Sequence, residues 1–118
     1  MRKLAFLILA AALVLGLGAC SLFNQAPVVV VTYYPESPTQ DQTIYFDASQ
    51  TADLENDDLT FTWTFVEKPV GSAATFDPAA AASTSFYADL SGNYDVRLTV
   101  SDGTNDVTAE ISLYVTGS

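Results

Sequence analysis

The 118-residue sequence contains no histidine and a single cysteine, Cys20. Without histidine, the chain lacks the usual base of nucleophilic hydrolysis and a preferred ligand of zinc and copper. Without a second cysteine, no disulfide can form within the chain, so stability must come from core packing. Paired carboxylates could serve a glycosidase, but a lone small domain offers loops and sheet faces rather than a cleft. The sequence therefore predicts no enzyme, and any metal must be held by oxygen ligands.

The first residues have the order of an exported signal peptide. A positive pair, Arg2-Lys3, precedes an apolar run over residues 4–17 that is too short for a comfortable membrane span. The segment that follows, Leu17-Gly18-Ala19-Cys20, resembles the lipobox of bacterial lipoproteins, in which a peptidase cuts before the cysteine and its sulfur receives the lipid. The alternative is an ordinary signal peptide with a chance cysteine. Lipidation would also remove the oxidation liability of an unpaired thiol in an exported protein.

We therefore expect three parts: a signal peptide over 1–19, lipidated Cys20 with a short tether over 20–26, and one domain over 27–118. The resemblance implies a membrane anchor through the lipid on Cys20. Ser21 resembles the residue that directs lipoproteins to the outer membrane of a cell with two membranes. After cleavage, Lys68 and Arg97 face fourteen carboxylates, which gives a net charge of −12. Such a charge excludes charge-driven binding to nucleic acid or to anionic headgroups.

The stretch Asp47–Trp63 organises the domain. A strand ends at Asp47, an acidic turn follows, and large apolar residues then alternate with threonines from Leu59 to Phe65. This period of two is typical of a half-buried strand, and Trp63 on its apolar face predicts a core between two sheets. The segment Ala79–Ala82 is too short to nucleate a helix, and we expect a turn there. Turn residues and alternation predict strands over 28–34, 42–47, 59–66, 85–90, 94–100 and 107–115.

Four segments in the same order resemble the PKD (polycystic kidney disease) domain, an immunoglobulin-like sandwich of bacterial surface proteins and secreted hydrolases. They are Asp47-Ala48-Ser49, Leu59-Thr60-Phe61-Thr62-Trp63, Gly92-Asn93-Tyr94-Asp95-Val96 and Leu98-Thr99-Val100-Ser101-Asp102-Gly103. The similarity runs from about Asn24 to Val115. It implies an all-β, two-sheet sandwich of about seven antiparallel strands, with Trp63 in the core and Tyr94 fixing a corner. After Trp63 the chain lacks the Asp-Phe-Gly-Asp-Gly loop of many members.

The acidic turn offers a candidate metal site. Asp53, Glu55 and Asp57 occupy alternate positions of this turn, and Asp102 lies in a later one. Because some PKD domains hold calcium at matching positions, the resemblance implies calcium ligands at Asn24, Asp53, Asp57 and Asp102. Oxygen ligands from separate loops suit calcium, which tolerates irregular geometry. The alternative is a solvated acidic turn followed by an ordinary Asp-Gly turn, and no other cofactor is expected.

Tyrosines mark a candidate contact surface. The alternation predicts that they point outward, and exposed tyrosines make good contacts with proteins or sugars. The alternative is cross-strand pairing that stabilises each sheet. The residues concerned are Tyr33, Tyr34, Tyr45, Tyr87 and Tyr114, of which we single out Tyr45, Tyr87 and Tyr114 as contacts.

The sequence therefore favours a lipid-anchored, non-catalytic module of the cell envelope that makes protein or carbohydrate contacts. The alternative is a structural spacer or subunit of an envelope assembly with no specific ligand.

Overall fold

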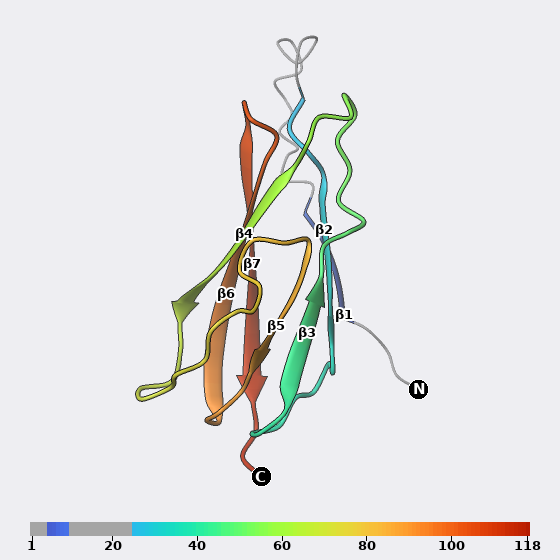
Figure 1. Ribbon diagram of the computed structural model, residues 1–118. Coiled ribbons are helices and arrows are strands. Elements are labelled where there is room, and N and C mark those ends of the chain that lie inside the picture. Colours follow the sequence, from blue (N-terminus) through green and yellow to red (C-terminus); the bar gives the residue numbers. More distant parts are fainter. Residues whose placement is uncertain (1–4, 10–24) are drawn as a thin grey trace.

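Two antiparallel sheets face each other in the computed structural model, which describes residues 5–9 and 25–118 (Figure 1). The first sheet has the order β1 (Ala5–Leu9), β2 (Val29–Tyr34), β3 (Thr43–Asp47) and β5 (Ser83–Tyr87). The second has the order β4 (Thr60–Glu67), β6 (Gly92–Ser101) and β7 (Asp106–Val115). The predicted all-β, immunoglobulin-like sandwich is confirmed. Residues 27–118 supply six of its strands, and the seventh, β1, lies inside the segment that we assigned to the leader.

Other sequence predictions fall outside the described residues. The segment Leu17–Cys20 and the first tether residues, up to Asn24, are among them. In the described part of the chain, no helix is long and apolar enough to cross a membrane. Residues 79–82 form bends rather than a helix, as expected from the short alanine run.

The alternation of the sequence places the apolar residues of both sheets in one core. Strand β7 is buried at every second residue from Val107 to Val115, and β6 follows the same pattern from Tyr94 to Val100. Every buried core residue in the described part of the chain belongs to the segment 29–115, which lies within the domain that we expect over 27–118. We therefore expect this part of the chain to fold without the residues that precede it.

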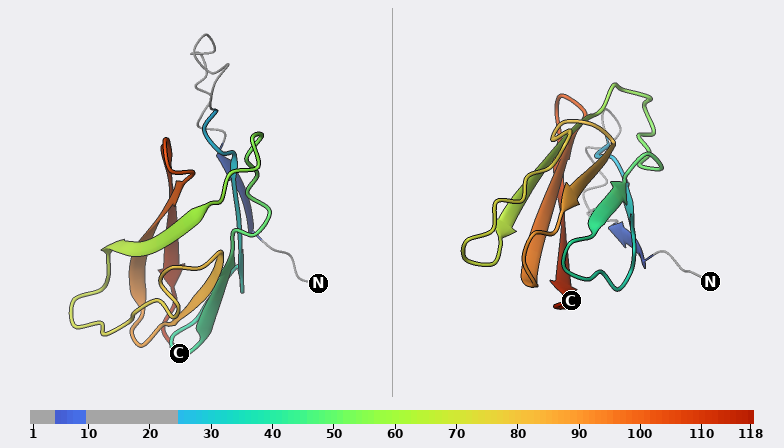
Figure 2. Two further views of the ribbon diagram at one scale, coloured as in Figure 1. Left: turned by 45° about the horizontal axis from the view of Figure 1, so that its top comes forward. Right: turned by 60° about the horizontal axis from the view of Figure 1, so that its bottom comes forward.

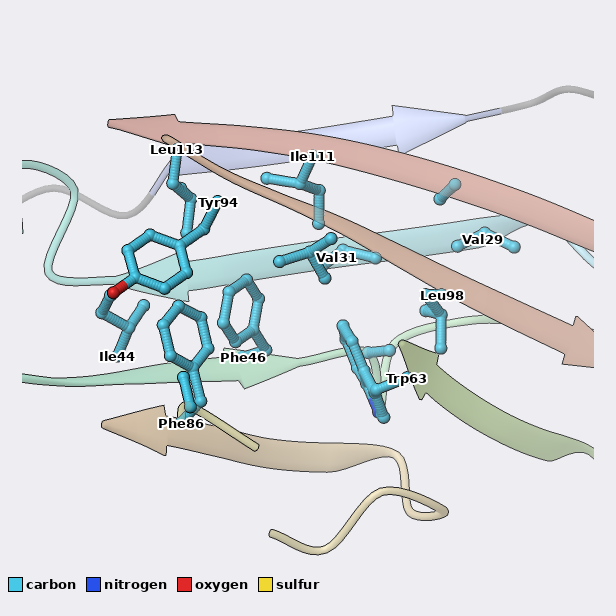
Figure 3. Packing of buried hydrophobic residues seen from close by; sticks show 14 of the residues in the cluster. Val29, Val31, Ile44, Phe46, Trp63, Phe86, Tyr94, Leu98, Ile111 and Leu113 are labelled. Carbon is cyan, nitrogen blue, oxygen red and sulfur yellow. The ribbon is translucent and has the colours of Figure 1, made fainter. Parts of the chain in front are cut away.

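An aromatic cluster joins the two sheets. Phe46, which is buried on β3, lies 5.4 Å from Trp63 on β4 and 5.9 Å from Phe86 on β5, measured between ring centroids. Figure 3 shows these rings pointing toward one another from three strands. Phe76, in the loop before β5, closes the cluster with a stacked contact of 4.3 Å to Phe65. Large offset or tilted rings of this kind fill the core of a small domain and stabilise it beyond their buried area.

Two hydrogen-bonded anchors hold the chain around this cluster. The Tyr94 hydroxyl donates to the Leu90 carbonyl at 2.6 Å and accepts the Leu90 N–H at 3.2 Å, so it ties the β5–β6 connection to β6. The buried Tyr94 therefore occupies the corner that the family resemblance implies. The Trp63 indole N–H donates to the Ala81 carbonyl at 2.7 Å, and the Trp63 backbone N–H donates to Ala79. These bonds fasten the segment 79–82 over the edge of β4.

Tyr33 departs from the prediction that it points outward. Its ring packs against the core and lies 5.8 Å from that of Phe46. Partial burial, followed by the charge of Glu36, raises the pKa of Tyr33. Because successive side chains of a strand point to opposite faces, only one of Tyr33 and Tyr34 could face outward, and that residue is Tyr34.

We expect Phe46→Ala to lower the free energy of unfolding by about 3–5 kcal/mol, because it opens a cavity at the centre of the aromatic cluster. Urea unfolding of residues 21–118, followed by tryptophan fluorescence, measures this change. The neighbouring outward substitution Tyr45→Ala is the control and should cost at most about 1 kcal/mol, the value of its cross-strand pair with Tyr34. Equal effects of the two substitutions would contradict the assignment of faces.

Candidate functional site

Three exposed tyrosines lie on the outward face of the first sheet. Tyr34, Tyr45 and Tyr87 come from β2, β3 and β5, and 50–57% of each residue is exposed. Tyr34 lies directly opposite Tyr45 in the register. Tyr87 lies opposite Thr43, two residues from Tyr45, so it is a diagonal neighbour of Tyr45. Side chains in such positions are separated by about 4.5–5.5 Å when directly opposite and by about 7–8 Å when diagonal, so the three rings form one surface. We call this surface the tyrosine face.

A shallow hollow of about 310 Å³ lies on the tyrosine face. Three polar residues in register, Thr32, Asp47 and Ser83, form part of its lining. Its other lining residues are Tyr33, Tyr34, Tyr45, Phe46 and Thr84. Aromatic walls with a few placed polar groups are the usual composition of a ligand site.

Asp47 supplies an ionised acceptor at this hollow. Hydrogen bonds from the side chain and the backbone N–H of Ser49 lower the pKa of Asp47, and a bond from Ser83 adds to them against the opposing effect of burial. The Ser49 N–H lies 2.8 Å and the Ser83 hydroxyl 3.3 Å from Asp47 Oδ1. These bonds hold the carboxylate in place while its exposed side can accept further donors.

Tyr87 is held by its own partner. Its hydroxyl donates to Asp41 Oδ1 at 3.0 Å, and this bond is the main reason why the pKa of Tyr87 is raised. The Tyr87 hydroxyl therefore stays protonated at physiological pH. Its bond to Asp41 holds the hydroxyl end of the ring in place and leaves the flat face of the ring available for contacts.

Tyr114 belongs to a different surface. It is 63% exposed, but it lies on β7 opposite Asn93, on the outward side of the second sheet. Of the three tyrosines singled out from the sequence, the structure brings together Tyr45 and Tyr87. Tyr34 completes their surface; it was among the five tyrosines expected to face outward but not among the three singled out as contacts.

The acidic turn forms a second cluster. Asp53, Glu55 and Asp57 each present a carboxylate oxygen, and these three oxygens lie within 4.8 Å of one another. Asp53 Oδ1 is buried and has no hydrogen-bond partner, whereas Asp53 Oδ2 accepts the Asp57 N–H at 2.7 Å. Desolvation raises the pKa of Asp57, and the charges of Asp53, Asp102 and Glu55 raise it further. The geometry and charge of these three residues fit a cation with oxygen ligands.

Asp102 lies near this cluster but has its own hydrogen bonds. Its Oδ1 atom accepts the N–H groups of Thr104 and Asn105 at 2.9 and 2.7 Å, which closes the β6–β7 turn. Burial raises the pKa of Asp102, but these backbone bonds outweigh it and the net pKa is lowered. Asp102 therefore contributes a fixed negative charge beside Asp57. Figure 1 shows its turn at the same end of the sandwich as the acidic turn.

The tether reaches the same end of the molecule. Asn24 lies outside the described residues, but the next residue, Gln25, donates its N–H to Glu55 Oε1 at 3.2 Å. The backbone pairing of Val28 with Ala52 holds the chain beside the turn. Glu55, which was not among the ligands implied by the resemblance, joins Asp53 and Asp57 in the cluster.

Comparison with known proteins agrees with this architecture. The chain is 35% identical over 100 residues to chitinase A of Pseudoalteromonas piscicida, a match that covers 85% of this chain and 12% of the chitinase. The chain therefore spans about an eighth of that relative. A nucleoside hydrolase-related protein from Saccharophagus degradans, associated with carbohydrate metabolism, has a similar fold, with a TM-score of 0.60 at 19% identity over 80% of this chain and 26% of that one.

The PKD domain of the KIAA 1837 protein superposes with a TM-score of 0.55 at 17% identity, over 71% of this chain and 85% of that domain. At such identities the two structures support the fold alone. The sequence profile of the PKD domain matches residues 24–117, which include both sheets from β2 onward, the tyrosine face and the acidic turn. The chain belongs to the PKD domain family.

Proposed function

We propose that this chain is a non-catalytic, lipid-anchored module of the cell envelope that binds carbohydrate through its tyrosine face. The observation that carries the proposal is the gathering of Tyr34, Tyr45 and Tyr87 from three strands on one face of the sheet, where Tyr34 and Tyr45 line a hollow that also presents Asp47. A sugar ring offers an apolar face and a rim of hydroxyls. The tyrosine rings match the apolar face, and Asp47 with its neighbouring hydroxyls matches the rim.

Charge and relationship both favour a neutral saccharide. The net charge of −12 that remains after removal of the leader opposes an acidic polymer. One relative is named a chitinase, and the Saccharophagus degradans protein of similar fold is associated with carbohydrate metabolism. A PKD domain often accompanies such proteins as a non-catalytic part, which agrees with the absence of histidine from this chain.

The anchor would hold the domain close to its membrane. Cys20 would carry the lipid, and the six residues Ser21–Ala26 could span at most roughly 20 Å at about 3.3 Å per residue. In a cell with two membranes, Ser21 would direct the protein to the outer one. An envelope protein is the alternative partner for the same face.

A structural spacer without a ligand is the second candidate function. The direct opposition of Tyr34 and Tyr45 in the register favours it, because such pairs also stabilise a sheet by themselves. Binding measurements distinguish the two functions. A carbohydrate-binding module should lose binding when the tyrosines are removed, whereas a spacer should show no binding that depends on them.

We expect residues 21–118 to be retained on insoluble chitin or cellulose, and the double variant Tyr45→Ala/Tyr87→Ala to bind at least about fivefold more weakly. Each lost aromatic contact costs about 0.5–1.5 kcal/mol. Tyr114→Ala, on the opposite sheet, is the matched control and should bind like the unsubstituted domain. Unchanged retention in the double variant, or none on either polymer, would favour the spacer.

The anchor has a separate test. Cells that express the whole chain should incorporate labelled palmitate into it and should retain it in the membrane fraction, because the lipid on Cys20 inserts into the bilayer. Cys20→Ala should abolish the label. Labelling that persists in this variant would contradict the lipidation site.

We also propose that Asp53, Glu55 and Asp57 bind calcium. Two observations support this proposal: Asp53 Oδ1 is buried without a hydrogen-bond partner, and the carboxylates repel one another. A divalent cation would give Asp53 Oδ1 a partner and would reduce the repulsion. The raised pKa of Asp57 also predicts how stability depends on pH. A raised carboxyl pKa means that the folded state binds the proton more tightly than the unfolded state does. The free energy of unfolding therefore falls as the pH rises past the ordinary carboxyl range.

We expect Asp57→Asn to raise the melting temperature in chelator at neutral pH, because it removes one of the repelling charges and keeps the backbone bond to Asp53. Calcium should raise the melting temperature of the unsubstituted domain but not that of the variant. Asp106→Asn, at the start of β7 and outside the cluster, is the control and should keep the calcium response. A domain that does not respond to calcium would identify the acidic turn as a solvated loop.

A further inference from the structure

The outer edge of β2 is occupied by a strand that does not belong to the PKD domain. Strand β1 pairs antiparallel with β2 in a five-residue register, from Ala5 opposite Tyr33 to Leu9 opposite Val29. Figure 2 shows β1, in dark blue, running beside β2 at the margin of the first sheet. The family match begins at residue 24, so β1 is an addition to the family's sandwich.

The hydrogen bonds of β2 show which of its groups face β1. The Val28 N–H donates to the Ala52 carbonyl, and the Val30 N–H donates to Thr51 Oγ1 at 3.1 Å, both on the β3 side. Because alternate residues of a strand direct their backbone groups to opposite sides, Val29, Val31 and Tyr33 direct theirs toward β1. The edge therefore presents three N–H and three C=O groups.

The other side of the sandwich is closed differently. The Trp63 N–H on β4 donates to the Ala79 carbonyl, and the Ser85 carbonyl on β5 accepts the Asp77 N–H. Residues 77–82 thus cover the edges of these two strands with the domain's own loop. At the edge of β2, the described chain supplies β1.

The cleavage that forms part of the proposed function would remove β1 and expose this edge. An unpaired edge of β-branched residues is a template for another strand, which natural domains either block or use for binding. Val29 and Val31 face the core, so a strand that completes the sheet must be apolar at the positions opposite them. Pro27 and Pro35 bracket the edge and limit the partner to about five residues.

We infer that the edge of β2 in the processed chain binds a short, extended, apolar segment of a partner polypeptide, antiparallel and in the register that β1 adopts. This edge is distinct from the tyrosine face, since it binds through backbone groups at the margin of the sheet. A second processed copy also lacks β1 and could pair only through its own strand edge, which would protect the amides of Val29, Val31 and Tyr33 in the free domain and would overturn the inference. The inference depends on the cleavage in the proposed function but not on carbohydrate binding.

The test is amide hydrogen exchange of residues 21–118 followed by NMR, with and without a peptide of residues 4–10 flanked by lysines for solubility. In the free domain, the amides of Val29, Val31 and Tyr33 should exchange rapidly, whereas those of Val28 and Val30 should be protected. The peptide should slow exchange at the three odd-numbered positions by about tenfold or more and leave the other two unchanged. The whole chain should show the same protection without added peptide.

The matched control is the same peptide with Leu7→Pro, which cannot continue a strand. Equal protection by both peptides would mean that the contact is nonspecifically apolar rather than strand-like, and would overturn the inference. Unchanged exchange with the first peptide would overturn it as well. The proposed function is tested separately, by palmitate labelling at Cys20 and by the retention of the Tyr45→Ala/Tyr87→Ala variant on chitin or cellulose. Failure of the strand-binding inference can therefore be distinguished from failure of the proposed function.

Discussion

The packing of Phe46 between the two sheets is the contact on which the arrangement of this domain depends. Its ring lies against Trp63 from the facing sheet and against Phe86 from the neighbouring strand. Once Phe46 points inward, the pleat directs Tyr45 and Asp47 outward. A single residue of slippage in β3 would bury Tyr45 and bring Phe46 to the surface. The core therefore fixes the position of the tyrosine face as firmly as it fixes the fold.

Much of this could be predicted from the sequence, because a period of two is a strong signal where one face of a strand is buried. The alternation from Leu59 to Phe65 identifies β4, and the same pattern in β6 and β7 identifies the second sheet. Alternation does not show which residue faces outward where two consecutive residues are both large. Tyr33 and Tyr34 have the same side chain, and only the pairing of Tyr34 with Tyr45 shows which of them faces outward.

Tertiary neighbours decide the remaining differences. The family resemblance grouped Asp102 with the acidic turn, and the two turns do lie at one end of the sandwich. The spacing could not show that the N–H groups of Thr104 and Asn105 occupy Asp102 Oδ1, nor that Glu55 turns toward Asp53 and Asp57. Such preferences depend on side-chain rotamers and local hydrogen bonds, which a pattern of residue types does not encode.

The binding features of the domain are separated by the geometry of the sandwich itself. A sheet has two faces, two ends and two margins, and here each kind of position carries a different chemistry. The acidic turn lies at the end where Gln25 contacts Glu55, so charge is concentrated beside the tether. The tyrosines lie on a face, where rings from neighbouring strands can act together. The margin at β2 would offer backbone groups after the proposed cleavage, and these groups recognise an extended chain. A small domain with one core could therefore hold the proposed anchor, ligand and partner strand at once, because none of the three would need the surface that another uses.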